Sequence, residues 1–419
     1  MQAQTKHSQE TLIYTIACLI ERAAFYSTRG VLLFYLLELL DNGNNAKAFD
    51  VFSYFVIAAT IGKIIGGLAG DLIKRRKLVI LAGGVIQAAG CLLIYSGSFE
   101  NAELGMYVLA LGIGLFKVNL EASLGRSYLT RPKSLDSGLM IYYLGANVGG
   151  FIGSGFIVNY GLENNLQMSF LISAFLALLA SALPLILLKK TVEVENTYKF
   201  EKISAIRILV IVLFTLCFSF LMTTGTITFG SLKLDAGSAF DSEMDASWWE
   251  LLGGGITMLI MGLLALLWTF RYTNQLFKLL VSFILMGLGF GLCFIVSEPY
   301  SGSTLFFIMM TLFLFTIADT YIAPVLASIT LQNVNPKFYG IALSLLYLPA
   351  MLSTFILLPI RSYLHSIEEG NFYLVLSFAS LLLGTIVYLI YSTDALKLND
   401  LKESSQVKET AIENDEILD

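Results

Sequence analysis

The sequence predicts an all-α membrane protein built from twelve transmembrane helices in two pseudo-symmetric halves of six helices each. Of the 419 residues, 56% are hydrophobic and only 14% are charged, whereas a soluble chain of this length needs a more polar surface. Apolar runs of about 20 residues, the length that crosses a bilayer, recur along nearly the whole sequence. The basic residues fall in alternate connections between these runs.

The apolar runs place the individual helices. We expect spans at 11–38, 50–70, 78–97, 103–125, 136–159, 167–188, 206–230, 248–270, 276–297, 303–331, 338–361 and 371–392. The first run is long enough to span, so we expect it to be retained as a helix rather than cleaved as a signal peptide.

Lysine and arginine are concentrated in every second connection, which predicts the orientation. One set of connections contains "KRRK" at 74–77 and "KK" at 189–190, while the other holds only Lys47, Lys233 and Arg361. Excess lysine and arginine marks the cytoplasmic side of a membrane. We therefore expect an integral multi-pass protein of the plasma (inner) membrane with both termini in the cytoplasm.

The longest basic-side connection divides the chain into two halves. The segment "TVEVENTYKFEKISA" separates the first six apolar runs from the last six. We expect an N-terminal bundle at 1–190, a cytoplasmic linker at 191–205, a C-terminal bundle at 206–392 and a disordered tail at 393–419. Two such halves are the architecture of many secondary transporters, whose substrate site lies between them near the middle of the membrane.

Histidine and cysteine usage argues against metal chemistry. The only histidines are His7 and His365, and the four cysteines lie in apolar runs without a CxxC motif. We therefore expect no metal, no haem and no other cofactor. No nucleophile and base are visible together, so an enzyme is not expected, and nothing points to nucleic acid.

Seven charged residues lie inside the predicted spans and away from their ends, and a charge at the bilayer centre costs about 3 kcal/mol. They are Glu21, Arg22, Arg29, Lys63, Lys117, Glu121 and Asp319. Lipid exposure of so many charges is prohibitive, so most are expected to face one another or water. Arg22, Tyr26 and Arg29 have the spacing of one helical stripe, and Lys117 and Glu121 lie four residues apart, close enough to pair.

Two of these charges have no obvious partner in the sequence. Asp319 has no cation nearby along the chain, so its partner comes from another helix or it carries a proton. That pattern is typical of a carboxylate that handles protons or cations. For Lys63 two interpretations stay open. Its side chain either contacts the charged cluster or extends to the cytoplasmic surface.

The first of these runs resembles a motif of the proton-dependent oligopeptide transporters, a family within the major facilitator superfamily. Their first helix carries Glu-x-x-Glu-Arg-Phe-x-Tyr-Tyr followed by a further arginine. In "IERAAFYSTRGVLLFYL", Glu21 and Arg22 match the second glutamate and the arginine, Tyr26 the second tyrosine and Arg29 the later arginine.

Later segments extend the resemblance. "GGLAGDLIKRRK" is similar to the superfamily loop between helices two and three, with Asp71 and a basic cluster. "LFKVN" resembles the Phe-Lys-Pro-Asn segment of helix four, placing Lys117 and Asn119 at its lysine and asparagine. "ANVGG" places Asn147 at the asparagine of the fifth-helix signature. "ADTYIAP" resembles the tenth-helix Gly-Glu-x-x-x-x-Pro, with Asp319 at the glutamate.

The resemblance implies a twelve-helix transporter that takes up di- and tripeptides together with protons, in contact with peptide, proton and lipid. It implies that Glu21 and Arg22 couple transport to protons. We expect Asp319 and Glu121 to take part in this coupling as well. It implies a substrate site formed by Tyr26, Arg29, Lys117, Asn119, Asn147 and Asp319. Within that site, Arg29 and Lys117 receive the peptide carboxylate and Asp319 faces the amine. The gating loop contains Asp71, Arg75 and Arg76.

The sequence also departs from the family. Cys18 stands where the motif has its first glutamate, and residues 214–229 lack the glutamate usual in helix seven. Glu121 is an additional acid, and we expect it to take over part of the work of the glutamate missing at Cys18.

Because of these departures, three readings stay open. They are a peptide symporter, a proton-coupled carrier or exporter of another small organic anion or zwitterion, and a membrane sensor that binds its ligand without moving it.

Overall fold

The computed structural model is helical throughout the residues it describes, which contain no strand. It describes residues 7–40, 45–73, 75–187, 210–225, 229, 246–271, 273–296, 304–353, 355–356 and 369–393. The predicted linker at 191–205 lies outside these residues, as does all but the first residue of the predicted tail at 393–419. The division into domains therefore stays a prediction.

The long helices follow the apolar runs closely. They are α1 (Gln9–Leu39), α2 (Asn45–Leu72), α3 (Arg76–Tyr95), α4 (Phe99–Ser127), α5 (Leu135–Phe151), α7 (Leu166–Ala182), α9 (Ala246–Phe270), α10 (Gln275–Ile295), α11 (Thr304–Asn333) and α14 (Glu369–Thr393). Within the described part of the chain, nine helical segments are long and apolar enough to cross a membrane. α1 is also long enough but less apolar, because its middle carries the three charges of Glu21, Arg22 and Arg29. A shorter apolar helix runs from Val210 to Gly225, and α12 covers Tyr339–Leu345.

The predicted fifth span, 136–159, is a composite rod. α5 continues without a break into a π-helical turn, η2 (Ile152–Ile157), and then into α6 (Val158–Glu163). π-helical turns insert an extra residue into a helix and often occur at functional sites. Gly153 of this turn packs directly on the backbone of α1 at Ala23 and Ser27, where a side chain does not fit.

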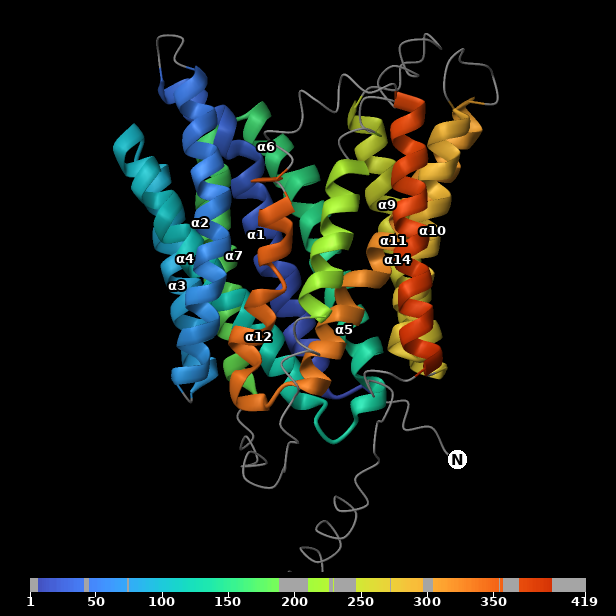
Figure 1. The fold of residues 1–419 in the computed structure, drawn as a ribbon. Coiled ribbons are helices and arrows are strands. Elements are labelled where there is room, and N and C mark those ends of the chain that lie inside the picture. The colour runs from blue at the N-terminus through green and yellow to red at the C-terminus, as the bar shows by residue number, and fades with distance from the viewer. Residues whose placement is uncertain are drawn as a thin grey trace, which may run out of the picture.

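The helices form two groups, as Figure 1 shows. α2, α3, α4 and α7 lie in one group and α9, α10, α11 and α14 in the other, with α1, α5 and α12 between them. Each group has its own apolar core. A third cluster joins them, because Phe116 of α4 and Tyr142 of α5 pack with Leu331 of α11 and with Tyr339 and Leu343 of α12.

This third cluster lies at the end of the bundle where α2 ends and α12 begins. We call it the basic end, because Arg76, Arg126, Lys133 and Lys337 all lie at helix termini there. It is the lower end in Figure 1, where α1 begins. The backbones of α2 and α12 touch at Gly67 and Gly340, and a Cβ on either glycine overlaps the other's carbonyl.

Candidate functional site

Two of the three charges in the middle of α1, those of Glu21 and Arg22, neutralise each other. Nε and Nη2 of Arg22 donate to the two carboxylate oxygens of Glu21, each at 2.6 Å. Both side chains are buried, at 4% and 0% exposure. Gln87 of α3 donates to the same carboxylate at 3.3 Å, and the guanidinium lies 4.6 Å from the ring centroid of Phe25. A bidentate pair with a further hydrogen bond is the form in which charges are tolerated in a nonpolar interior.

The predicted stripe along α1 therefore divides. Arg22 is buried in its ion pair, while Tyr26 and Arg29 are exposed. Arg29 makes no hydrogen bond or ion pair with any residue that the structure describes. The Arg29 guanidinium is thus free to bind a ligand.

Glu121 of α4 is held by two tyrosines rather than by a lysine. Tyr143 of α5 donates to one carboxylate oxygen at 2.6 Å, and Tyr347, which follows α12, donates to the other at 2.9 Å. The direct ion pair with Lys117 that helical spacing permits is not formed in this conformation, in which each carboxylate oxygen accepts from a tyrosine hydroxyl. Glu121 instead connects α4 with α5 and with the segment after α12. Its role in proton coupling stays a prediction.

Lys63 and Lys117 approach the ring of Tyr347 instead of a carboxylate. The Lys63 ammonium lies 4.2 Å from the ring centroid and that of Lys117 lies 4.9 Å from it. The Lys63 side chain therefore points into the bundle. In this conformation it does not extend to the cytoplasmic surface, which was one of its two interpretations. A cation over an aromatic face is attracted by the electrons of the ring, but this attraction is weaker than an ion pair with a carboxylate.

Asp319 lies in α11 with its side chain exposed. It has no hydrogen bond or ion pair to any part of the chain that the structure describes. The sequence prediction that no local cation neutralises it agrees with this geometry.

The two predicted asparagines contribute to helix contacts. Asn119 is fully buried, and its amide donates at 2.8 Å to the carbonyls of Gly66 in α2 and of Leu115 in its own helix. Asn147 donates to the carbonyl of Tyr143 at 2.9 Å and contacts the sulfur of Met261 in α9 at 3.3 Å. The structure thus brings Asn119 between α2 and α4, away from the exposed residues, and a substrate role for either asparagine stays a prediction.

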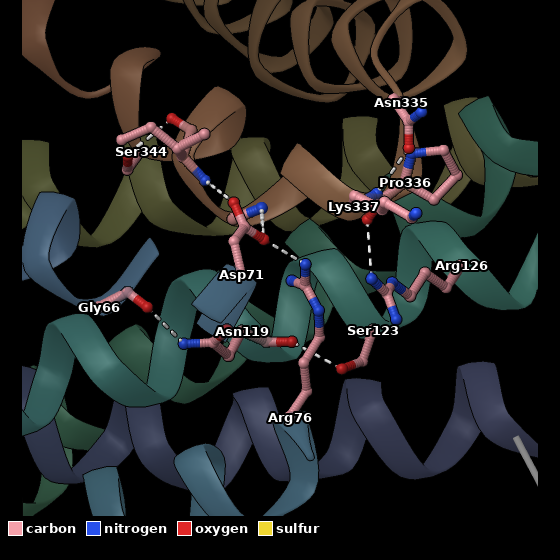
Figure 2. A network of polar contacts seen from close by, with 12 residues as sticks. Gly66, Asp71, Arg76, Asn119, Ser123, Arg126, Asn335, Pro336, Lys337 and Ser344 are labelled. Atoms are coloured by element: carbon pink, nitrogen blue, oxygen red, sulfur yellow. Dashed lines mark hydrogen bonds and ion pairs between the residues drawn. The ribbon is translucent and has the colours of Figure 1, made fainter. Parts of the chain in front are cut away.

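The predicted gating loop reaches across to α12, as Figure 2 shows. Asp71, at the end of α2, pairs with Arg76 of α3. Its two carboxylate oxygens also accept the backbone N–H groups of Gly340 and Ile341 at 3.0 and 2.8 Å. An anion at a helix N-terminus satisfies N–H groups that have no partner within the helix and interacts favourably with the helix dipole. Arg75, the third predicted member, is exposed.

Sequence reasoning missed a second connection at the basic end. Asp136 in the first turn of α5 pairs with Lys278 of α10, and it also accepts from Gln275 and Ser328. Both charged side chains are only 1% exposed. Lys278 counts as a surface charge in the positive-inside pattern, but α10 begins at Gln275 and carries it into the interior. The available signal was an acid and a base at the starts of two apolar runs, which does not specify a pairing.

Comparison with known proteins places this geometry in a family. The model of the Major Facilitator Superfamily matches residues 18–345. A dipeptide and tripeptide permease from Chromobacterium violaceum is 35% identical over 135 residues, which are 32% of this chain and 27% of the permease. A permease of the same name from Proteus mirabilis is 32% identical over 143 residues, 34% of this chain and 29% of that one. The chain thus matches less than a third of the length of these curated relatives.

Solved structures share the fold across nearly the whole chain. A human organic anion transporter superposes with a TM-score of 0.74 and 14% identity, covering 91% of this chain and all of that one. A peptide transporter of the proton-dependent family, solved with sulfate, gives a TM-score of 0.60 and 16% identity, covering 94% of this chain and 95% of that one. The family match covers most of the sequence, and the fold agrees with it throughout. The chain is therefore a membrane protein that belongs to the Major Facilitator Superfamily.

Proposed function

We propose that the protein is a proton-coupled symporter that takes up di- and tripeptides by alternating access. It lies in the inner membrane with its basic end and both termini in the cytoplasm. It needs no cofactor, because the proton gradient drives transport, and it is not an enzyme.

One observation carries this proposal. Among the described residues, Arg29 and Lys117 lack a carboxylate partner and Asp319 lacks a cationic one. A short peptide carries the complementary charges, a carboxylate at one end and an ammonium at the other. Arginine is suited to hold a carboxylate with two hydrogen bonds and lysine to attract it as a point charge. The names of the permease relatives support a peptide as the substrate.

Alternating access requires that the contacts at the basic end break during the cycle. In the conformation described here, Asp71 and Asp136 hold this end together. Proton binding at Glu21, Glu121 or Asp319 is expected to shift the balance between conformations, because it changes which cations are neutralised. Arg22 in turn is released from Glu21 when that carboxylate binds a proton.

Uptake by reconstituted protein tests the proposal. We expect proteoliposomes with an inward proton gradient to concentrate labelled dialanine. The variant Asp319→Asn should lose this accumulation while retaining some exchange of dialanine across the membrane. Accumulation that persists undiminished in Asp319→Asn contradicts the role of this carboxylate. Saturable binding of dialanine by wild-type protein without any flux indicates a sensor instead.

A carrier of another small organic anion is the second candidate. The fold agrees most closely, among the structures compared above, with an organic anion transporter, and the cations exceed the acids near Tyr347. Accumulation of organic anions but not of dialanine under the same gradient favours this reading.

A further inference from the structure

Lys63 is a charge that the proposed peptide site does not use. It lies in the middle of α2, with its ammonium 4.2 Å from the ring centroid of Tyr347. Lys117 of α4 approaches the same ring, at 4.9 Å. The two ammonium groups therefore lie against a single side chain.

Neither lysine has an anion to neutralise it. In the described part of the chain, no carboxylate oxygen lies within 4 Å of either ammonium. The acid on the same helix as Lys117 is Glu121, whose two oxygens accept from Tyr143 and Tyr347. Glu21 is likewise committed to Arg22. The nearby acids thus form their hydrogen bonds and ion pairs with other groups. Lys63 and Lys117 are attracted by Glu121 only at longer range.

Such a pair of cations is unfavourable in a membrane protein without an anion. Like charges held around one side chain repel each other where water is scarce, and each cation has lost part of its hydration. An anionic ligand relieves both costs, because it brings negative charge to the two ammonium groups together. The proposed peptide site already assigns Arg29 and Lys117 to the peptide's terminal carboxylate, so Lys63 is a further cation that this carboxylate does not require.

We propose that Lys63 is a specificity-determining residue, which together with Lys117 binds a second acidic group on the substrate. This inference rests on the proposed peptide transport and adds to it a preference for peptides with an aspartate or glutamate side chain. Tyr347 is the platform that holds both ammonium groups in place while the site is empty.

Binding of matched ligands to the purified full-length protein tests this. Alanyl-aspartate and alanyl-asparagine have nearly the same shape and differ by one negative charge. We expect wild-type protein to bind alanyl-aspartate about tenfold more tightly, which corresponds to about 1.4 kcal/mol. Lys63→Met should remove this difference while changing the affinity for alanyl-asparagine less than about twofold, and Lys63→Arg should keep it. Equal binding of the two peptides by wild-type protein overturns the proposal, and so does an equal loss of both in Lys63→Met.

Lys47→Met is the matched control. Lys47 lies on the same helix and also contacts an aromatic ring, that of Phe99 at 4.4 Å, but it is exposed at the far end of α2. We expect this variant to keep the wild-type preference. Lys63→Met should unfold at no lower temperature than wild-type protein, because it removes a repulsion. A clear loss of thermal stability means that Lys63 is structural, and contradicts the proposal.

Two further ligands separate this inference from the peptide function. Succinate and succinamate differ by one carboxylate and are not peptides. If no dipeptide binds but succinate binds better than succinamate in a Lys63-dependent way, peptide transport is wrong and the Lys63 site stands. If dialanine is transported but no added acidic group improves binding, the function stands and the Lys63 site is wrong.

Discussion

Two junctions hold the basic end of the molecule together, and they are built differently. We call the contact between Asp71 and the start of α12 the backbone junction, and the contact between Asp136 and Lys278 the side-chain junction. In each, a carboxylate from the N-terminal part of the chain reaches a helix of the C-terminal part. Asp71 finds backbone N–H groups there and obtains its cation, Arg76, from its own group. Asp136 finds its cation across the junction, in α10.

The difference affects how each junction responds when it opens. If α12 moves away from α2, Asp71 keeps Arg76 as a partner and loses only uncharged N–H donors. If α10 moves away from α5, Asp136 and Lys278 lose each other, and each is left as a charge that water must solvate. Neutral hydrogen bonds contribute about 1 kcal/mol each, whereas a buried charge that loses its partner costs about 3–5 kcal/mol. The side-chain junction is therefore expected to be the stronger of the two.

The largest effect is expected from breaking the side-chain junction on one side. Lys278→Met leaves Asp136 buried without its cation and should lower the stability of this conformation by about 3–5 kcal/mol. Thermal unfolding in detergent measures this as a large fall in the melting temperature. The double variant Asp136→Asn with Lys278→Met should recover most of the loss, because it removes both charges. A double variant that is as unstable as the single one contradicts the assignment of the loss to an unpaired charge.

A smaller effect is expected at the backbone junction, where packing rather than charge can be altered. Gly340→Ala places a Cβ against the carbonyl of Gly67 and the carboxylate of Asp71, so α2 and α12 must separate. We expect faster labelling of a cysteine introduced at Ser344, which is buried in the closed junction. The control is Gly262→Ala in α9, where no atom lies within 4 Å of the added Cβ. Equal labelling in the two variants shows that the contact between the glycines does not hold the junction closed.

The two junctions also differ in how far the sequence predicts them. Asp71 belongs to a recognisable motif, and its loop was predicted as a gate. Asp136 and Lys278 are 142 residues apart, and neither stands out, since an acid in a first helical turn is ordinary. Only the packing of α5 against α11, on which α10 packs in turn, brings them together. The long helices that the structure describes were predictable for the opposite reason, because each depends on local apolar composition alone.

The same limit applies to the charges inside the bundle. The partner of Arg22 was next to it in the sequence, and Asp319 was expected to have no cation nearby along the chain. The partners of Glu121 were not predictable, because the two tyrosines that donate to it come from α5 and from the segment after α12, far from Glu121 in the sequence. Helical spacing predicts which residues of one helix can contact each other. It does not predict which residue of another helix will form the contact instead.

The smallest effect is expected from a third contact at the basic end, whose stability depends on pH. His7 precedes α1, and its ring nitrogens lie 2.7 Å from the hydroxyl of Tyr128 and 3.2 Å from that of Thr269 in α9. Burial lowers the pKa of His7 below its usual 6.5, and it raises the pKa of Tyr128 to about 12, so that hydroxyl stays protonated. The undocked histidine then binds protons more readily than the docked one. Docking is therefore fully favoured above pH 6.5 and weakens as the pH falls below it.

Because His7 is only half-buried and its hydrogen bonds are neutral, we expect docking to contribute no more than about 1 kcal/mol. Hydrogen exchange at the start of α1, followed between pH 7.5 and 5.5 with the intrinsic exchange rate corrected for, measures it. Protection should fall toward the acidic side in wild-type protein and stay constant in His7→Gln, which keeps a polar side chain but does not titrate. Protection in wild-type protein that is constant or rises with acid shows that the histidine does not link α4 to α9. The basic end is then held by the two carboxylate junctions, and its response to pH must come from those acids.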